Sequence, residues 1–325
     1  MKRHGNLYSQ IISIENLILA DKKARKGKLR SYGVLRHDAN RQNNILSLHD
    51  NLTDGTFSTS PYKIFTIHDP KEREIYQLPY YPDRIVHHAI MNILEPIFVS
   101  VFTADTYSCI KGRGIHAAAS KLKHVLHDYP QQTTYCLKLD IHKFYPSIDH
   151  SILKNIIRRK IKDKKLLTLL DEIIDSALGV PIGNYLSQYF ANLYLAHFDH
   201  WLKEVKHVKY YFRYADDMVI LHSDKDYLRS LFLEIQLYLN NNLNLQVKSN
   251  WQIFPVASRG IDFLGYVFYH THTRLRKRIK QRFCRRIAQL SKRDISEKEY
   301  QQVVCSWMGW AKHCDSKYLL KKILK

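Results

Sequence analysis

Two adjacent acids stand between two runs of apolar and aromatic residues at 209–222, KYYFRYADDMVILH. Runs rich in Tyr, Phe, Val and Ile around a short polar stretch predict a β-hairpin, with Asp216 and Asp217 at its turn. A second apolar strand is predicted at 135–141, YCLKLDI, and Asp140 lies at its end. Acids at the ends of adjacent strands can converge, so the pattern predicts a sheet that gathers three carboxyl groups at one edge.

Three convergent carboxyl groups predict a metal site. Like charges this close together repel unless cations neutralise them, and oxygen ligands suit magnesium. Two magnesium ions about 3.5–4 Å apart activate a 3′-hydroxyl and stabilise a leaving pyrophosphate. A zinc site is not expected, because the five cysteines show no CxxC spacing and Cys305, His313 and Cys314 lack a fourth ligand. A solvated turn remains the alternative, since it is the commoner explanation of an isolated pair of acids.

The basic residues are concentrated at the two ends of the chain. The formal net charge is +21, from 51 Lys and Arg against 30 Asp and Glu. Residues 1–40 carry +6 and residues 270–325 carry +12, whereas 41–269 carries only +3. A near-neutral body with two basic ends favours a polyanionic partner, and counterion release makes nucleic acid the favoured one. A solvated, solubilising surface is the alternative.

The sequence predicts neither a membrane protein nor a secreted one. No apolar run approaches the ~20 residues that a membrane span needs. The basic N-terminus, MKRHGNLYSQ, is followed by no apolar core or cleavage site of a signal peptide. Five cysteines, an odd number, argue against a disulfide framework. We therefore expect a cytoplasmic protein without a membrane partner.

Strands and helices are interleaved along most of the chain. Helices are predicted at 10–30, at 83–102 with Pro96 as a kink or break, at 150–178 as a pair, and at 184–203. Strands are predicted at 63–81, around a turn at Asp69-Pro70, and at 135–141, 208–222 and 261–269. The chain is helical and basic from about 275. This order predicts an α+β fold with an appended helical unit.

YADD at 214–217 in an aromatic hairpin, with LDIHKFYPSID upstream, resembles the palm of a reverse transcriptase. Other segments resemble further parts of that family in the same order. They are Lys71-Glu72-Arg73 of the fingers, PDRIVHHAIMNILEPIF (82–98), SCIKGRGIHAA (108–118), PIGNYLSQYFANLYL (181–195), NLQVKSN (244–250) and the primer-grip segment IDFLGYVF (261–268). The resemblance implies a right-hand polymerase fold. It implies fingers at 1–88 and 148–186, a palm with an antiparallel sheet at 89–147 and 187–269, and a small helical basic thumb at 270–325.

The resemblance also implies a role for individual residues. Asp140, Asp216 and Asp217 would be catalytic ligands of two Mg²⁺ ions, together with the main-chain carbonyl of Ile141. Lys248 would protonate the leaving pyrophosphate, although a solvated loop lysine is the alternative. The implied nucleotide-binding residues are Lys71, Arg73, Tyr145, Ile182, Gly183 and Gln188. The implied primer grip is Phe263, Leu264 and Gly265, and the implied nucleic-acid contacts of the thumb are Arg274, Arg276, Arg278 and Arg282.

Two nucleotide-binding positions have specific implications. The ring of Tyr145 would collide with a 2′-hydroxyl and so select deoxynucleotides, whereas a core aromatic is the alternative. Many family members have Gln-Gly where this chain has Ile182-Gly183, and Ser-Pro where it has Ser187-Gln188. Ile182 lacks the amide hydrogen bond, which is worth about 1–3 kcal/mol where buried. This pattern is similar to that of reverse transcriptases of diversity-generating retroelements, which copy a template RNA with errors at adenines. The alternative is that Ile182 is a neutral sequence difference and that the chain is another kind of bacterial reverse transcriptase.

The expected function is therefore RNA-directed DNA polymerisation in a diversity-generating retroelement, by mutagenic retrohoming. The expected partners are a template RNA, an RNA–DNA hybrid, deoxynucleoside triphosphates and a small basic accessory variability protein. A group II intron-like, retron-like or phage-defence reverse transcriptase is the first alternative. A non-catalytic RNA-binding scaffold is the second, and the three acids argue against it.

Overall fold

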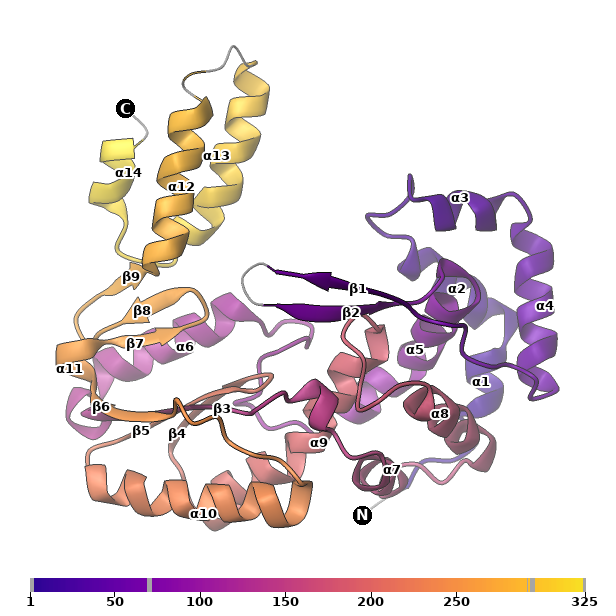
Figure 1. The fold of residues 1–325 in the computed structure, drawn as a ribbon, viewed down its shortest axis with the longest axis horizontal. Helices are drawn as coiled ribbons and strands as arrows, with labels where there is room; N and C mark the ends of the chain where they lie inside the picture. The colour runs from indigo at the N-terminus through magenta and orange to yellow at the C-terminus, as the bar shows by residue number, and fades with distance from the viewer. Residues whose placement is uncertain (1–2, 69–71, 291, 293–295, 324–325) are drawn as a thin grey trace. The chain divides into compact units, whose positions relative to one another are not determined.

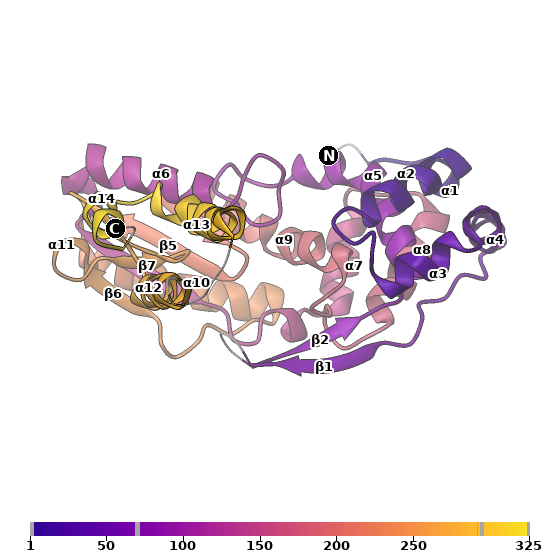
Figure 2. The ribbon, with the colours of Figure 1, turned by 90° about the horizontal axis from the view of Figure 1, so that it is seen from above.

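The computed structural model describes residues 3–68, 72–290, 292 and 296–323 (Figures 1 and 2). The chain divides into two compact units, each assembled from separate stretches of sequence. Unit 1 comprises 1–103, 142–201 and 238–246, and unit 2 comprises 104–141, 202–237 and 247–325. The predicted division into fingers, palm and thumb uses different boundaries and stays a prediction.

Unit 1 is mostly helical, with one two-stranded hairpin. Its elements are α1 (Tyr8–Ile12), α2 (Ile14–Ala24), α3 (Tyr32–Asp38), α4 (Arg41–Thr53), β1 (Lys63–Ile67), β2 (Arg73–Gln77), η1 (Tyr80–Arg84), α5 (Ile85–Val99), η3 (Tyr145–Ser147), α7 (His150–Arg158), α8 (Lys164–Asp175) and α9 (Tyr185–His200). The apolar helix α5 packs against α2 and α9, and α7 also packs against α9. Strands β1 and β2 pair antiparallel, with Ile67 opposite Arg73.

Unit 2 contains two antiparallel sheets and the C-terminal helices. Its elements are α6 (Ile115–Asp128), η2 (Pro130–Thr133), β3 (Tyr135–Asp140), η4 (Trp201–Val205), β4 (Tyr210–Tyr214), β5 (Asp217–His222), α10 (Lys225–Leu243), β6 (Gln252–Pro255), α11 (Val256–Arg259), β7 (Ile261–Phe263), β8 (Tyr266–Phe268), β9 (Thr273–Leu275), α12 (Lys277–Leu290), α13 (Glu297–Ala311) and α14 (Lys317–Ile323). Trp201 and the last turns of α10 belong to unit 1. The strand orders are β4-β5-β3-β6 and β7-β8-β9.

One hydrophobic core joins the two sheets of unit 2. Alternate residues of β4 and β5, among them Phe212 and Val219, pack with Ala118 and Leu122 of α6 and with residues of β7 and β8. The alternation of buried side chains follows from the two-residue period of a strand. A second, smaller core forms between α12 and α13 around Phe283, whose ring stacks on that of Trp307 at 5.3 Å.

The structure confirms most predicted elements and corrects three. The predicted helix at 10–30 is two helices, α1 and α2, separated at Ser13, and the second ends at Ala24. The α+β class, the strand at 135–141, the hairpin at 208–222, the helix pair at 150–178 and the basic helical tail are confirmed. Pro96 does not break its helix, because α5 runs through it to Val99. The predicted single strand at 261–269 is wrong: two positive-φ residues, Leu264 and Gly265, form the turn of a β7–β8 hairpin there. The predicted turn at Asp69-Pro70 lies outside the described residues.

No helix in the described ranges combines the length and apolar character that a membrane crossing requires.

Candidate active site

The predicted convergence of the three acids is realised in the four-stranded sheet of unit 2. Antiparallel pairing of β3 with β5 places Asp140 directly opposite Asp217. Tyr214 pairs with Asp217 across the β4–β5 hairpin, so Ala215 and Asp216 alone form its turn. Ala215 has a φ of 55°, a conformation that two-residue hairpin turns require and that L-residues rarely adopt. The turn therefore projects Asp216 beside the Asp140–Asp217 pair.

The two hairpin acids have raised pKa values. Burial, then the hydrogen bond and charge of Asp140, raise the pKa of Asp216 to about 7. Burial also raises the pKa of Asp217 to about 6; the charge of Lys138 opposes this shift and that of Asp140 adds to it. Because both folded-state values lie above the ordinary one, protonation of these acids stabilises the fold at low pH. That contribution is lost as the pH rises through about 6 to 7.

Lys248 lies against Asp140 through both its main chain and its side chain. Its backbone N–H donates to the main-chain oxygen of Asp140 at 2.8 Å, and its ammonium donates to Asp140 Oδ2 at 2.5 Å. The neighbouring residue Val247 forms an antiparallel bridge with the buried Ile141. In this structure Lys248 is therefore paired with Asp140 and is not a freely solvated loop lysine, and its catalytic role stays a prediction.

A second lysine near the acids was not predicted from the sequence. The ammonium of Lys138 lies 3.8 Å from Asp217 Oδ1 and donates to the main-chain oxygen of Asp262 on β7. The carboxylate of Asp262 in turn accepts from Arg276 Nε at 2.6 Å. The sequence did contain a signal for Lys138, because residues two apart on a strand share a face and Lys138 therefore lies on the face of Asp140. No sequence signal linked Asp262 to it.

The donor set at this edge fits hard divalent cations. Asp140 Oδ1 and Asp217 Oδ1 are buried and have no hydrogen-bond partner, a costly arrangement unless another group satisfies them. Carboxylate oxygens are the ligands that magnesium prefers. Among the described residues, no group of three or more His, Cys, Asp or Glu side chains has an arrangement that could hold a metal ion without some side-chain movement. The ammonium of Lys248 already bonds to Asp140 Oδ2, so a cation at that oxygen would share it with the ammonium or displace the ammonium.

The predicted primer grip and all four predicted thumb arginines also lie in unit 2. Phe263 is fully buried, and Leu264 and Gly265 form the turn that follows it. Gly265 has a φ of 89°, and a Cβ there would lie 2.7 Å from the Trp310 ring, so α13 packs closely on this turn. The guanidinium of Arg274 lies 5.3 Å from the centroid of the Tyr269 ring. That of Arg276 pairs with Asp262 at 2.5 Å.

The remaining predicted thumb arginines, Arg278 and Arg282, lie on α12. Their roles stay predictions, as do those of Phe263, Leu264 and Gly265.

The predicted nucleotide-binding residues belong to unit 1. Tyr145 is half-buried, in contrast to the neighbouring core residue Phe144, and its main-chain oxygen accepts from the N–H of Val180 at 2.9 Å. Arg73 begins β2 and is exposed, and Gln188 on α9 is exposed as well. Lys71 lies outside the described residues. Tyr145 is thus partly accessible and Arg73 and Gln188 are exposed, and their roles in nucleotide binding stay predictions.

Gly183 has a structural requirement that the sequence did not indicate. The N–H of Tyr76 on β2 donates to the main-chain oxygen of Ile182 at 2.8 Å. Gly183 has a φ of 128°, and a Cβ there would lie 2.4 Å from the main-chain oxygen of Tyr76. The glycine therefore allows the Ile182-Gly183 segment to pack against the β1–β2 hairpin, whatever it does toward a nucleotide.

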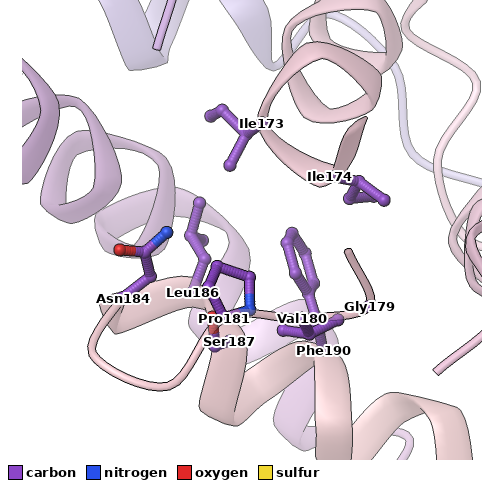
Figure 3. Close-up of a pocket in the computed structure, with 9 residues that line it drawn as sticks. All are labelled: Ile173, Ile174, Gly179, Val180, Pro181, Asn184, Leu186, Ser187 and Phe190. Carbon is purple, nitrogen blue, oxygen red and sulfur yellow. The ribbon is translucent and has the colours of Figure 1, made fainter. Parts of the chain in front are cut away.

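A small cavity lies beside this segment. Figure 3 shows the side chains that surround it, among them Ile173 and Ile174 of α8 and Leu186 and Phe190 of α9. Its volume is about 10 Å³, which accommodates roughly one water molecule. This size and the mostly apolar lining exclude it as a nucleotide site and identify it as part of the packing that supports residues 179–187.

Residues 67–268 match the sequence model of the family described as "Reverse transcriptase (RNA-dependent DNA polymerase)". The match spans most of the chain and includes all three acids. The chain belongs to the reverse transcriptase family. The enzyme class expected from the sequence, an RNA-directed DNA polymerase, is therefore confirmed.

Curated relatives of this reverse transcriptase include bacterial and intron-encoded proteins. It is 25% identical over 266 residues to Protein YkfC of Escherichia coli, covering 67% of this chain and 69% of that protein. It is 21% identical over 297 residues to the group II intron-encoded protein LtrA of Lactococcus lactis, covering 68% and 49%. It is 27% identical over 169 residues to nuclear intron maturase 4 of Arabidopsis thaliana, covering 47% and 20%. The chain thus spans about half or less of these two intron proteins.

Solved structures with a similar fold include two telomerases in complex with a fragment of telomeric RNA. The structure from Candida albicans has a TM-score of 0.51 and 11% identity, covering 84% of this chain and 58% of that one. The structure from Candida tropicalis has a TM-score of 0.51 and 12% identity, covering 85% and 58%. At this identity the likeness concerns the fold alone, and it confirms the right-hand polymerase fold predicted from the sequence.

Proposed function

We propose that this reverse transcriptase copies a template RNA into DNA by two-metal nucleotidyl transfer. The observation that carries the proposal is the convergence of Asp140, Asp216 and Asp217 at one sheet edge, where two buried carboxylate oxygens have no hydrogen-bond partner. These acids and the main-chain carbonyl of Ile141 would hold two Mg²⁺ ions. When bound, the ions would activate the primer 3′-hydroxyl and stabilise the charge of the leaving pyrophosphate.

The lysines around the acids have distinct proposed roles. Lys248 neutralises Asp140 before the cations bind and then becomes available to donate a proton to the leaving pyrophosphate. Lys138 remains on the Asp217 side, where its bond to Asp262 holds it in place. In this proposal the cations replace Lys248 as the counter-charge of Asp140, whereas Lys138 stays beside Asp217.

Unit 1 would bind the incoming deoxynucleoside triphosphate. Arg73 has the planar donors that match phosphate oxygens, and Lys71 would assist it. Ile182, Gly183 and Gln188 would lie beside the base and sugar.

The primer and the hybrid would be bound by other residues. Phe263, Leu264 and Gly265 of unit 2 would position the primer. In this proposal residues 1–88 and 148–186 act as fingers, 89–147 and 187–269 as palm and 270–325 as thumb. Arg274, Arg276, Arg278 and Arg282 would contact the RNA–DNA hybrid.

Replacing Tyr145 by Ala is expected to weaken selection against ribonucleotides. The half-buried ring would no longer exclude a 2′-hydroxyl, so the ratio of deoxynucleotide to ribonucleotide efficiency should fall by about 10- to 100-fold. Single-nucleotide primer extension measures this ratio. The matched control is Tyr32→Ala, which removes an exposed ring elsewhere in unit 1. A ratio that does not change would mean that Tyr145 only packs against Phe144.

We further propose that the RNA is the template of a diversity-generating retroelement and that an accessory protein assists its copying. The sequence Ile182-Gly183, followed by Ser187-Gln188, supports this proposal. A group II intron-like function is the second candidate, and the likeness to an intron maturase and to a group II intron-encoded protein favours it. Sequencing the DNA beside the gene separates the two, because a template repeat with a near-identical variable repeat is expected only for the first.

Ile182→Gln is expected to lower misincorporation opposite template adenines. The new amide would supply about 1–3 kcal/mol of discrimination, which corresponds to roughly 5- to 150-fold. Deep sequencing of the cDNA made from the native RNA measures the error at each template base. Ile182→Val serves as the control, because it changes the side-chain volume but adds no hydrogen-bonding group. An unchanged adenine error rate would refute the role of Ile182, and an unmutated enzyme without adenine bias would favour the intron-like candidate.

The experiment that tests the proposed polymerase activity is primer extension on an RNA template by the purified protein with Mg²⁺. Extension that depends on the three acids is expected. Binding of the hybrid without extension under any divalent cation would instead make the chain an RNA-binding scaffold.

A further inference from the structure

A polar cavity of about 340 Å³ lies in unit 2 at the end of the β4–β5 hairpin opposite to the three acids. It is lined by the loop before β4, the first residue of β4, the end of β5 and the start of α10, with Gln132 of η2. Leu221 lies four residues beyond Asp217 on β5, which is about 13 Å along a strand. The cavity is therefore separate from the candidate active site.

The lining of this cavity is basic. The lining residues are Gln132, Lys206, His207, Val208, Lys209, Tyr210, Leu221, His222, Ser223 and Tyr227, all of them described and none of them acidic. The charge of Lys206 is balanced by Glu234 on α10. No acid of the described residues forms an ion pair with Lys209, whose ammonium lies 5.2 and 5.1 Å from the ring centroids of Tyr129 and Tyr210. One positive charge is thus left for a ligand.

Hydrogen bonds within the lining use its acceptor atoms and leave several donors available to a ligand. Gln132 Oε1 accepts from Lys209 Nζ at 2.9 Å and from the Tyr210 hydroxyl at 2.6 Å, which leaves the amide NH₂ as a donor. His222 Nδ1 accepts from the backbone N–H of Asp224 at 3.0 Å, so a neutral His222 carries its proton on Nε2. An ammonium, an amide NH₂ and an imidazole N–H are the groups that bind an anionic oxygen.

Aromatic rings lie in and beside the lining of the cavity, close to these donors. The rings of His222 and Tyr227 stack with centroids 4.1 Å apart, and the ring of Tyr129 is exposed beside Tyr210. Basic groups interleaved with aromatic rings are typical of surfaces that bind single-stranded nucleic acid, where rings stack on bases and cations contact phosphates.

We propose that this cavity binds a backbone phosphate of the template RNA in a single-stranded stretch outside the region being copied. The inference rests on the proposed function, which supplies the RNA. It adds a second contact between the RNA and unit 2, on the far end of the hairpin that carries Asp216 and Asp217.

Lys209→Gln tests the proposal, because Lys209 is exposed and its replacement leaves the core of unit 2 intact. The matched control is Lys225→Gln, which makes the same charge change at the start of α10 outside the lining. The two probes are a minimal RNA–DNA hybrid and the same hybrid with a long single-stranded 5′ extension of the RNA. Dissociation constants are measured without divalent cations at several salt concentrations.

The expected result is a loss confined to one variant and one probe. Lys209→Gln should weaken binding of the extended RNA by about 3- to 10-fold and reduce its log–log salt slope by about 0.7, because one phosphate contact is lost. The minimal hybrid and Lys225→Gln should show no change. An equal effect of both variants, or an equal loss on the minimal hybrid, would overturn the proposal.

A further arm separates RNA from free phosphates. Inorganic phosphate and ATP should compete with the extended RNA only at concentrations far above that of the RNA. Competition at similar concentrations would overturn RNA as the occupant and identify a small-molecule phosphate site. If the unmutated protein shows no primer extension while Lys209→Gln still weakens binding of the extended RNA, the proposed polymerase function fails and the RNA site stands.

Discussion

Replacing Asp216 by Asn should abolish RNA-templated primer extension while leaving RNA binding nearly unchanged. Asp216 and Asp140 interact at the sheet edge, and removal of one carboxylate disables the proposed pair of cations. Because bound cations contribute several kcal/mol of transition-state stabilisation, the rate should fall by at least about 100- to 1000-fold. Affinity for the hybrid arises mainly from basic residues and should stay within about twofold. Single-turnover extension and filter binding on the same preparation measure both quantities.

The control for Asp216→Asn is Asp226→Asn, which makes the same charge change at an exposed position of α10. It should leave extension unaltered. If Asp216→Asn retains extension within tenfold of the unmutated protein, the assignment of the acids as cation ligands is wrong. A parallel loss of RNA binding would point instead to a folding defect in the hairpin.

Gly183→Ala should disrupt the contact between the Ile182-Gly183 segment and the β1–β2 hairpin. The added Cβ would lie 2.4 Å from the Tyr76 carbonyl oxygen, at a φ of 128° that an alanine rarely adopts. Backbone strain of about 1–3 kcal/mol and overpacking of about 1–3 kcal/mol together predict a loss of about 2–6 kcal/mol. Urea unfolding measures the global part of this loss. Hydrogen exchange of the Tyr76 amide reports the local part, because that amide donates to Ile182.

Gly55→Ala is the control that separates the effect of backbone strain from that of steric overlap with Tyr76. Gly55 also lies in unit 1 and has a positive φ of 71°, but a Cβ there meets nothing within 4 Å. It should cost only the ~1–2 kcal/mol of a left-handed alanine. If Gly183→Ala destabilises no more than Gly55→Ala and leaves exchange of the Tyr76 amide unchanged, the close approach to Tyr76 does not constrain this position.

The catalytic edge could be predicted from the sequence because its signals are local. Alternating apolar residues locate β3, β4 and β5, and the position of Asp140 at a strand end and of Asp216 at a turn follows from them directly. The counter-charges are only partly local. Lys138 shares a strand with Asp140, whereas Asp262 reaches it from β7, more than a hundred residues later. A pairing of this kind depends on how two sheets pack, and no periodicity encodes it.

The conformations at Gly265 and Pro96 also depend on tertiary packing and could not be predicted from the local sequence. Gly265 was expected within a strand, yet it forms a turn with Leu264, because both residues have positive φ and α13 packs closely on them. Pro96 was expected to kink or break a helix, and α5 continues through it without a break, packed against α2 and α9. Tertiary packing decided both cases against the local preference. The basic cavity around Lys209 likewise draws on four separate elements, so only the structure reveals it.

The most direct test of the account is a count of bound divalent cations, with Mn²⁺ as a spectroscopic substitute for Mg²⁺. We predict two ions per chain at about pH 8 with the hybrid and a non-reactive nucleotide bound, and fewer than two for Asp216→Asn. Affinity should fall as the pH is lowered through about 7 and then about 6, because protons compete for Asp216 and Asp217 at their raised pKa values. Two ions retained by Asp216→Asn, or none bound by the unmutated protein, would contradict the claim that these three acids form a two-metal centre.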